Sequence, residues 1–405
     1  MLTRLRVKNW KLLRDVELEL EREVPTVLIG PNASGKSTVI EVLDFLARCA
    51  WDGLEEAVVA HGGMEVVRTA GVREPVEIES SWGFTSGEGT DKERYWSLRW
   101  SVTIDAGPSG QVFVRKESLH DGERTLVSMT DEGERVAANE QDAETPPAKI
   151  KARGALAFHA LVDPDRFPAL TFLRYVVSEI RVLGAMASAA SWAKADPERA
   201  SARDSVVLST QQFVGREGIG LAAALYNLHT DHGDAWDQLQ RAFRAEFPFT
   251  KRIVFPADPG GSRISFAVED TRFTGRKIYA SEMSDGMIVY LCLLSMIVHP
   301  DQRAVLALDE PDAHLHPSAL RRLLALAHEK HARRHLLIVT HSNALLDELR
   351  DPAASVRIVE PSREGARFRK LDPEALAAWR GQYTLSEMRR TGLLDPANAA
   401  GGADE

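Results

Sequence analysis

The chain of 405 residues contains only two cysteines, Cys49 and Cys292, and each lies in an apolar pattern typical of a helix. We therefore expect buried thiols and no disulfide, which suits a reducing cytoplasm. No run approaches the roughly 20 consecutive apolar residues that a membrane-spanning helix needs. The opening stretch MLTRLRVKNWKLL lacks the apolar core of a secretory signal. These absences predict a cytoplasmic protein.

An excess of positive charge is also missing, because the formal net charge is −9. This excludes a uniformly basic surface for nucleic acid, although a local basic patch is not excluded. Arginine and lysine gather at 321–334 and at 363–370, and such clusters are more often a solvated face than a binding site. Hydrophobic residues make up 44% of the chain, which is enough for one large domain with an insertion or for two domains.

The most specific feature is the stretch TVLIGPNASGKSTVIEVL at 26–43. It begins with a short apolar run typical of a buried strand, matches G-x-x-x-x-G-K-[ST], and continues with a helical pattern. Backbone N–H groups of such a loop and of the following helix bind phosphate oxygens. The residues expected to contact a nucleotide are Gly30, Pro31, Asn32, Ala33, Ser34, Gly35, Lys36, Ser37 and Thr38. The alternative, a glycine-rich turn without a ligand, is disfavoured by the strand before it and the helix after it.

Within this loop, Lys36 is expected to reach the β- and γ-phosphates, and the Ser37 hydroxyl to bind Mg²⁺. Two later apolar runs, RAVLALDEP and HLLIVTHS, predict buried strands that end in Asp309-Glu310 and in His341. Strands of an open α/β sheet bind ligands at their carboxyl ends. We therefore expect Asp309 to hold Mg²⁺ opposite Ser37, Glu310 to orient and polarise the attacking water, and His341 to contact the γ-phosphate. The alternatives are a strand capped by acids and a structural histidine.

A further stretch, YASEMSDGMIVYLCLLSMIV, places Ser284, Asp285 and Gly286 before a strongly apolar helix. Serine and glycine at a helix N-terminus can form a second phosphate-binding site. Because the loop at 30–37 already supplies one, this site could complete the nucleotide pocket of a neighbouring chain. From the spacing alone, an ordinary helix cap is an equally good interpretation.

Together, these stretches resemble the Walker A, signature, Walker B and switch-histidine motifs of ABC-class ATPases. Within that class the chain resembles the RecF/SMC/Rad-fifty type and the OLD-like prokaryotic ATPases of the AAA family. DEPDAHLHP is similar to that family's Asp-Glu-Pro-Glu-x-x-Leu-His-Pro, and LTRLRVKNWKLLRDVELEL resembles its first hairpin. In the signature, Asp285 replaces a glycine and Met287 a Gln or Glu, so a contact between chains would rest on Ser284, Gly286 and the helix end.

The resemblance implies an α/β fold, with an ABC-type P-loop ATPase head built on a mixed sheet with flanking helices and carrying an inserted lobe of strands and helices. It implies ATP and Mg²⁺, and a homodimer that closes on two ATP molecules and opens after hydrolysis. The implied role is a switch or sensor in DNA repair or anti-phage defence, with DNA and a separately encoded nuclease or toxin effector as candidate partners. We expect no Toprim nuclease in this chain, because the only Asp-x-Asp, at 163–165, lies in its middle.

The expected organisation has five segments. They are an ATPase head with Walker A (1–73), a β-rich insertion with a mobile loop (74–149), a mostly helical lobe with a strand region (150–278), the second part of the head (279–360) and a C-terminal tail (361–405). A transporter nucleotide-binding subunit is the alternative function, disfavoured by the long middle region and by the lack of a clear glutamine loop. A non-hydrolysing ATP-dependent scaffold is a second alternative, disfavoured by Glu310.

Overall fold

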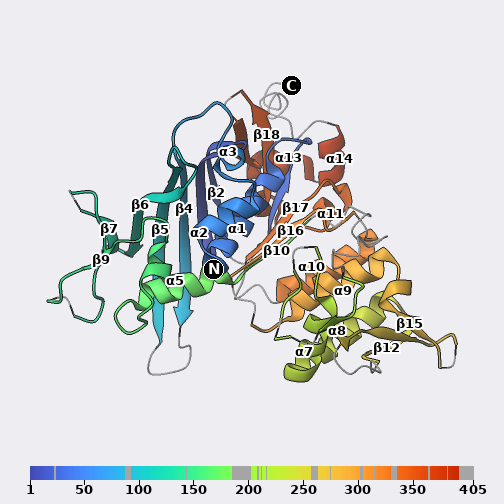
Figure 1. Cartoon of the computed structure of the whole chain (residues 1–405). Helices are drawn as coiled ribbons and strands as arrows, with labels where there is room; N and C mark the ends of the chain where they lie inside the picture. Colours follow the sequence, from blue (N-terminus) through green and yellow to red (C-terminus); the bar gives the residue numbers. More distant parts are fainter. Residues whose placement is uncertain are drawn as a thin grey trace, which may run out of the picture.

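The structure is a computed structural model that describes residues 1–391 except 22–23, 87–92, 131, 143, 185–201, 208, 211, 216, 257–262, 274, 302–303, 314, 330–334, 364 and 381. Two large β-sheets lie on opposite sides of helix α1 (Lys36–Trp51), and a group of helices covers the outer face of the second sheet (Figure 1).

The first sheet is antiparallel and has eight strands in the order β2-β1-β4-β5-β6-β7-β8-β9. Its strands are β1 (Leu2–Trp10), β2 (Leu13–Glu19), β4 (Val76–Ser86), β5 (Arg94–Ala106), β6 (Val112–Asp121), β7 (Arg124–Met129), β8 (Arg135–Ala137) and β9 (Ala148–Ile150). The alternating opening sequence forms the expected hairpin, in which Val7 lies opposite Val16. Strand β4 pairs directly with β1, so the β-rich region continues the sheet that the N-terminal hairpin begins.

The second sheet has six strands in the order β10-β16-β17-β3-β18-β19. They are β10 (Ile180–Leu183), β16 (Val305–Asp309), β17 (His335–Val339), β3 (Thr26–Ile29), β18 (Val356–Ser362) and β19 (Gly365–Lys370). All neighbours from β10 to β18 are parallel, and only β19 is antiparallel. Because parallel strands end at the same edge, this sheet brings the segments that follow β3, β16 and β17 together.

Helices and small sheets complete the described residues. The remaining elements are α2 (Leu54–Ala60), α3 (Met64–Val67), α4 (Ala157–Ala160), α5 (Pro168–Ser178), β11 (Val206–Val207), α7 (Leu221–Asp231), α8 (Gly233–Glu246), β12 (Thr250–Val254), β13 (Arg263–Ile264), β14 (Ala267–Asp270), β15 (Lys277–Tyr279), η1 (Ala280–Glu282), α9 (Asp285–Val298), α10 (Pro317–Glu329), α11 (Asn343–Asp347), α12 (Pro352–Ser355), α13 (Pro373–Arg380) and α14 (Leu385–Arg390).

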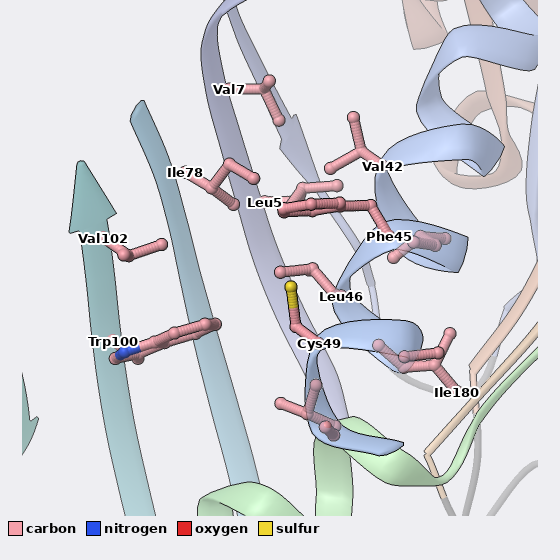
Figure 2. Packing of buried hydrophobic residues seen from close by; sticks show 14 of the residues in the cluster. Leu5, Val7, Val42, Phe45, Leu46, Cys49, Ile78, Trp100, Val102 and Ile180 are labelled. Carbon is pink, nitrogen blue, oxygen red and sulfur yellow. The ribbon is translucent and has the colours of Figure 1, made fainter. Parts of the chain in front are cut away.

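The strands of the second sheet contribute alternate side chains to two hydrophobic cores. In the first core, Phe45, Leu46 and Cys49 of α1 pack against Leu5 and Trp100 of the first sheet (Figure 2). The second core lies on the other face of the second sheet and is built around α9, whose residues from 287 to 298 are all buried. Helix α1 packs between the two sheets within the first core, which also includes Leu28, Val305 and Val339 of the second sheet, so the loop that precedes it is held as well.

Both cysteines are free and buried, as expected. In the part of the chain described by the structure, no helix combines the length and apolarity required to cross a bilayer.

One expectation about secondary structure was wrong, and one strand was missed. Residues 131–149 were expected to form a mobile loop, but they contribute β8 and most of β9 to the edge of the first sheet. The reason is a buried ion pair between Arg135 and Glu117, which a hydrophobic pattern does not reveal. The region from 150 to 250 is mostly helical among its described residues, as expected, but the sequence did not predict that Ile180–Leu183 forms β10, which pairs in parallel with β16.

Candidate nucleotide-binding site

The loop between β3 and α1 lies against β18, and this position requires glycine at its first residue. Gly30 has φ 156°, and a Cβ atom added there would lie 2.1 Å from the carbonyl oxygen of Val359. Gly35, which directly precedes α1, has φ 102°, and Ala33 also has a positive φ of 58°. The glycines of the sequence pattern therefore allow a tight loop at the N-terminus of α1, where backbone N–H groups lack helical partners.

Lys36 is buried in this loop, with 5% of its surface exposed. Its Nζ atom donates hydrogen bonds to the carbonyl oxygens of Gly30 (3.1 Å) and Pro31 (2.7 Å). No carboxylate of the described residues forms an ion pair with it, and burial lowers the pKa of its ammonium group. The loop therefore holds a buried positive charge that neighbouring carbonyl oxygens solvate only in part, which suits an anionic ligand.

Ser37 and Asp309 come from distant parts of the sequence and meet at this loop. The Ser37 Oγ atom donates a hydrogen bond to Asp309 Oδ1 at 3.0 Å. The sheet explains the contact, because Asp309 pairs with Val339 of β17, and Val339 pairs with Leu28 of β3. A hydroxyl and a carboxylate at this separation are the oxygen ligands that Mg²⁺ prefers, so these residues fit the ion.

Glu310 and His341 form a second pair beside the loop. His341 Nε2 lies 3.6 Å from Glu310 Oε1, and each side chain remains about one-third exposed. Glu310 has φ 49°, an uncommon conformation for a residue other than glycine, and its N–H group donates to the carbonyl oxygen of Val339 at 2.9 Å. Such backbone strain is found preferentially at functional sites. Burial and the nearby charge of Lys36 lower the pKa of His341, so its ring is neutral at neutral pH.

One supporting residue was missed in the sequence. Asp312 Oδ1 accepts a hydrogen bond from the Oγ1 atom of Thr340 at 2.5 Å, and the same Thr340 oxygen accepts from the N–H group of Ser342 at 2.8 Å. This chain of contacts fixes the segment that carries His341 to the segment that carries Glu310. The third acid of the DEPD sequence was the available signal.

The segment at 284–286 lies apart from this cluster, and no contact recorded for it among the described residues reaches the loop at 30–37. Ser284 caps α9, where its Oγ atom accepts from the N–H group of Met287 at 3.4 Å, and its side chain is exposed. Arg203 pairs with Asp285 at 2.6 Å and also donates to the carbonyl oxygen of Met283. Arg203 therefore offsets the negative charge of Asp285, the residue that distinguishes this segment from the signature motif of ABC-class ATPases. The sequence alone did not indicate this role for Arg203.

This fold and this arrangement define a P-loop ATPase with an ABC-type head. Two family models match the chain on either side of its middle region. Residues 1–84, which include the phosphate-binding loop, match the family described as "AAA ATPase domain". Residues 216–347, which include Ser284, Asp309, Glu310 and His341, match the family described as "AAA domain, putative AbiEii toxin, Type IV TA system".

Comparisons with individual proteins agree with this class. A segment of 54 residues is 39% identical to the OLD nuclease of Thermus scotoductus, and it spans 13% of this chain and only 10% of that protein. An SMC head crystallised with the C-terminal winged-helix domain of ScpA has a TM-score of 0.53 at 14% identity, with 92% of this chain and 98% of that chain covered. At this identity the second comparison shows the fold alone. The chain resembles P-loop ATPases of the RecF/SMC/OLD-like type in its family matches and has the fold of their ABC-type head, which confirms the expected fold class and the resemblance.

Proposed function

We propose that this protein binds ATP with Mg²⁺ and hydrolyses it to ADP and phosphate. The observation that carries the proposal is the contact between Ser37 and Asp309 beside the buried ammonium group of Lys36. These residues are up to 273 positions apart in a sequence of 405, and the fold brings them to one sheet edge together with Glu310 and His341. No structural need of the sheet explains a lysine and two carboxylates at that edge, whereas the binding of a nucleoside triphosphate does.

Each group has a defined role in this proposal. The backbone N–H groups of the loop and Lys36 bind the phosphates, and Ser37 and Asp309 would hold Mg²⁺, which neutralises phosphate charge when it is bound. Glu310 orients a water molecule and accepts its proton. The neutral ring of His341 donates a hydrogen bond to the terminal phosphate and is itself positioned by Glu310, 3.6 Å away.

The direct test is phosphate release by the purified full chain with MgATP, compared with release in the presence of excess EDTA. We expect multiple turnovers that require the divalent ion. If ATP fails to bind in equilibrium dialysis, the proposed function is wrong, and if it binds without turnover, the protein is an ATP-dependent scaffold.

We further propose that two chains associate through ATP, each presenting Ser284 to the nucleotide of the other. The support is the exposed N-terminus of α9, which is capped by a small hydroxyl residue and followed by Gly286. Arg203 reduces the repulsion that Asp285 would exert on a phosphate. A self-complementary contact of this kind gives a two-fold symmetric dimer.

Replacing Ser284 with arginine should leave ATP binding intact and abolish ATP-driven dimerisation. The long side chain would fill the space in front of the α9 N-terminus that the partner's phosphate requires. The dimer is measured by size-exclusion chromatography coupled to light scattering in the presence of ATP. Each protein also carries Glu310→Gln, which is expected to slow hydrolysis so that ATP persists. Ser109→Arg, in an exposed turn between β5 and β6, is the matched control. An unchanged dimer in the Ser284→Arg protein would show that the segment at 284–286 does not contact the nucleotide.

The biological role that we propose is an ATP-dependent switch in DNA repair or in defence against phage, with a separate effector protein. The support is the short match to an OLD nuclease, together with the fold shared with an SMC head. The Asp-x-Asp of this chain stabilises a turn, because Asp163 Oδ1 accepts hydrogen bonds from the N–H groups of Asp165 and Arg166. We therefore assign nuclease chemistry to a partner.

Three arginines of the basic clusters noted in the sequence engage acidic neighbours, whereas residues 330–334 of the first cluster lie outside the described residues. Arg321 pairs with Glu348, Arg322 with Glu246, and Arg369 with Glu360. These pairs favour the interpretation of a solvated face. A role for DNA is tested by adding duplex or single-stranded DNA to the ATP hydrolysis assay. Stimulation of hydrolysis supports a repair role, and a lack of stimulation favours a protein trigger.

A further inference from the structure

The C-terminal segment of the described chain places a second cationic side chain beside the proposed ATP site. Helix α14 docks on α11, the helix that begins two residues after His341. Leu385 and Met388 are buried in this contact, and the N–H group of Ser386 donates to Asp347 Oδ1 at 2.9 Å. Thr384 and Glu387 cap the N-terminus of α14 reciprocally. These contacts hold α14 in one orientation.

Arg389 extends from this helix towards the segment that carries His341. Its Nη1 atom donates to the carbonyl oxygen of His341 at 3.4 Å and to Asn343 Oδ1 at 3.3 Å. Both bonds are long, and both acceptors are uncharged. No carboxylate among the described residues lies within ion-pair distance of the guanidinium group, although partial burial lowers its pKa. A guanidinium group has five N–H donors, so most of its hydrogen-bonding capacity is unused.

The charge of Arg389 acts on the proposed catalytic groups. It disfavours the charged forms of Lys36 and His341, although Glu310 acts on both groups in the opposite direction, and Asp312 is the acid that acts on Arg389. No carboxylate among the described residues forms an ion pair with Lys36 or with Arg389, so both partly buried cations keep hydrogen-bonding capacity for an anionic ligand. The terminal phosphate of a nucleoside triphosphate, with its several oxygens, is such an anion.

We propose that Arg389 is a further catalytic residue, whose guanidinium group contacts the terminal phosphate of the ATP bound by its own chain; this rests on the proposed ATPase function. In hydrolysis, the water oxygen forms a bond to the γ-phosphorus, and the bond from that phosphorus to the β–γ bridging oxygen breaks. The electron pair of the broken bond leaves with ADP, and the proton of the water passes to Glu310. Arg389 stabilises the negative charge on the γ-phosphoryl oxygens while this occurs.

The test compares Arg389→Ala and Arg389→Lys with Arg390→Ala in the full chain. Arg390 is the adjacent, exposed residue of the same helix and has no place in the site. We expect Arg389→Ala to lower kcat by on the order of 10²–10³-fold, as the loss of one charged transition-state contact does. ATP affinity, measured in the Glu310→Gln background, should fall at least several-fold, whereas ADP affinity stays the same because ADP lacks the contacted phosphate.

The lysine variant should recover part of the rate, since it keeps the positive charge but lacks the planar guanidinium group with its several N–H donors. A kcat within about threefold of the wild type would overturn the proposal. Equal losses of ATP and ADP affinity would also overturn it, because they would show that Arg389 only holds the segment after β17. If the alanine variant fails to fold, Arg389→Lys tests the proposal through the same comparison of ATP affinity with ADP affinity. A wild-type chain that binds no ATP refutes the ATPase function itself. If the wild type hydrolyses ATP and Arg389→Ala hydrolyses it equally well, this proposal alone is refuted.

Discussion

Replacing Glu310 with glutamine should slow ATP hydrolysis by about 10²–10⁴-fold while ATP still binds. Glutamine keeps the size of the side chain and its place beside His341, 3.6 Å away, but it cannot accept the proton of the attacking water. Because ATP then persists in the site, the lifetime of the ATP-bound dimer should lengthen. Single-turnover phosphate release gives the chemical rate, and light scattering after dilution gives the dimer lifetime.

The matched control for this variant is Glu329→Gln at the exposed end of α10. It removes the same charge at a distance from the loop and should leave both measurements unchanged. Turnover of Glu310→Gln at the wild-type rate would remove Glu310 from its proposed role and would leave Asp309 and His341 as the groups to test next.

Removal of the buried cation Arg135 is expected to cause the largest loss of stability. Its guanidinium group lies 2.7 Å from Glu117, and their side chains are 4% and 0% exposed. Glu117 also accepts hydrogen bonds from Trp100 Nε1 (3.1 Å) and from the N–H group of Ala157 (3.0 Å). We expect Arg135→Met to lower the free energy of unfolding by about 3–5 kcal/mol, because it leaves a buried carboxylate without its partner. Urea unfolding, followed by tryptophan fluorescence, measures the change.

The pH dependence of this variant follows from the same burial, which already raises the pKa of Glu117. Without Arg135, the folded carboxyl group takes up a proton more readily than the unfolded one, so the loss of stability should grow as the pH rises above the usual range for glutamate. The double variant Glu117→Gln/Arg135→Met should lose less than the sum of the two single variants. Additive losses, or a loss below about 1 kcal/mol for Arg135→Met, would show that the pair contributes little.

Much of the site could be predicted from the sequence because its strands are short, apolar and fully buried. Apart from Thr26 and His335, which lie within hydrogen-bond distance of each other at the starts of β3 and β17, the runs that became β3, β16 and β17 are apolar before their functional ends. The helical pattern after Gly35 predicted α1. Apolar periodicity is a local signal, so it located the segments. The placement of their ends at one edge followed from the general behaviour of parallel sheets.

Other features depend on contacts between distant residues, and no local pattern predicts those. The four residues of β10 are too few for a periodic signal, and β8 is held by a buried arginine. Arg203 reaches Asp285 from a segment without regular structure. Arg389 belongs to the C-terminal tail, to which the sequence assigned no role, and only the docking of α14 on α11 shows where it lies.

The position of β3 in its sheet also constrains how the protein is made. Its two neighbours, β17 and β18, begin at His335 and Val356, hundreds of residues later in the chain. On the ribosome, this strand is therefore synthesised long before its neighbours and remains with both edges open until β17 has emerged, which is a period of exposure to aggregation and a natural point for chaperone binding. A nascent chain that stalls before β17 contains the entire Walker A sequence and still has no ATP site.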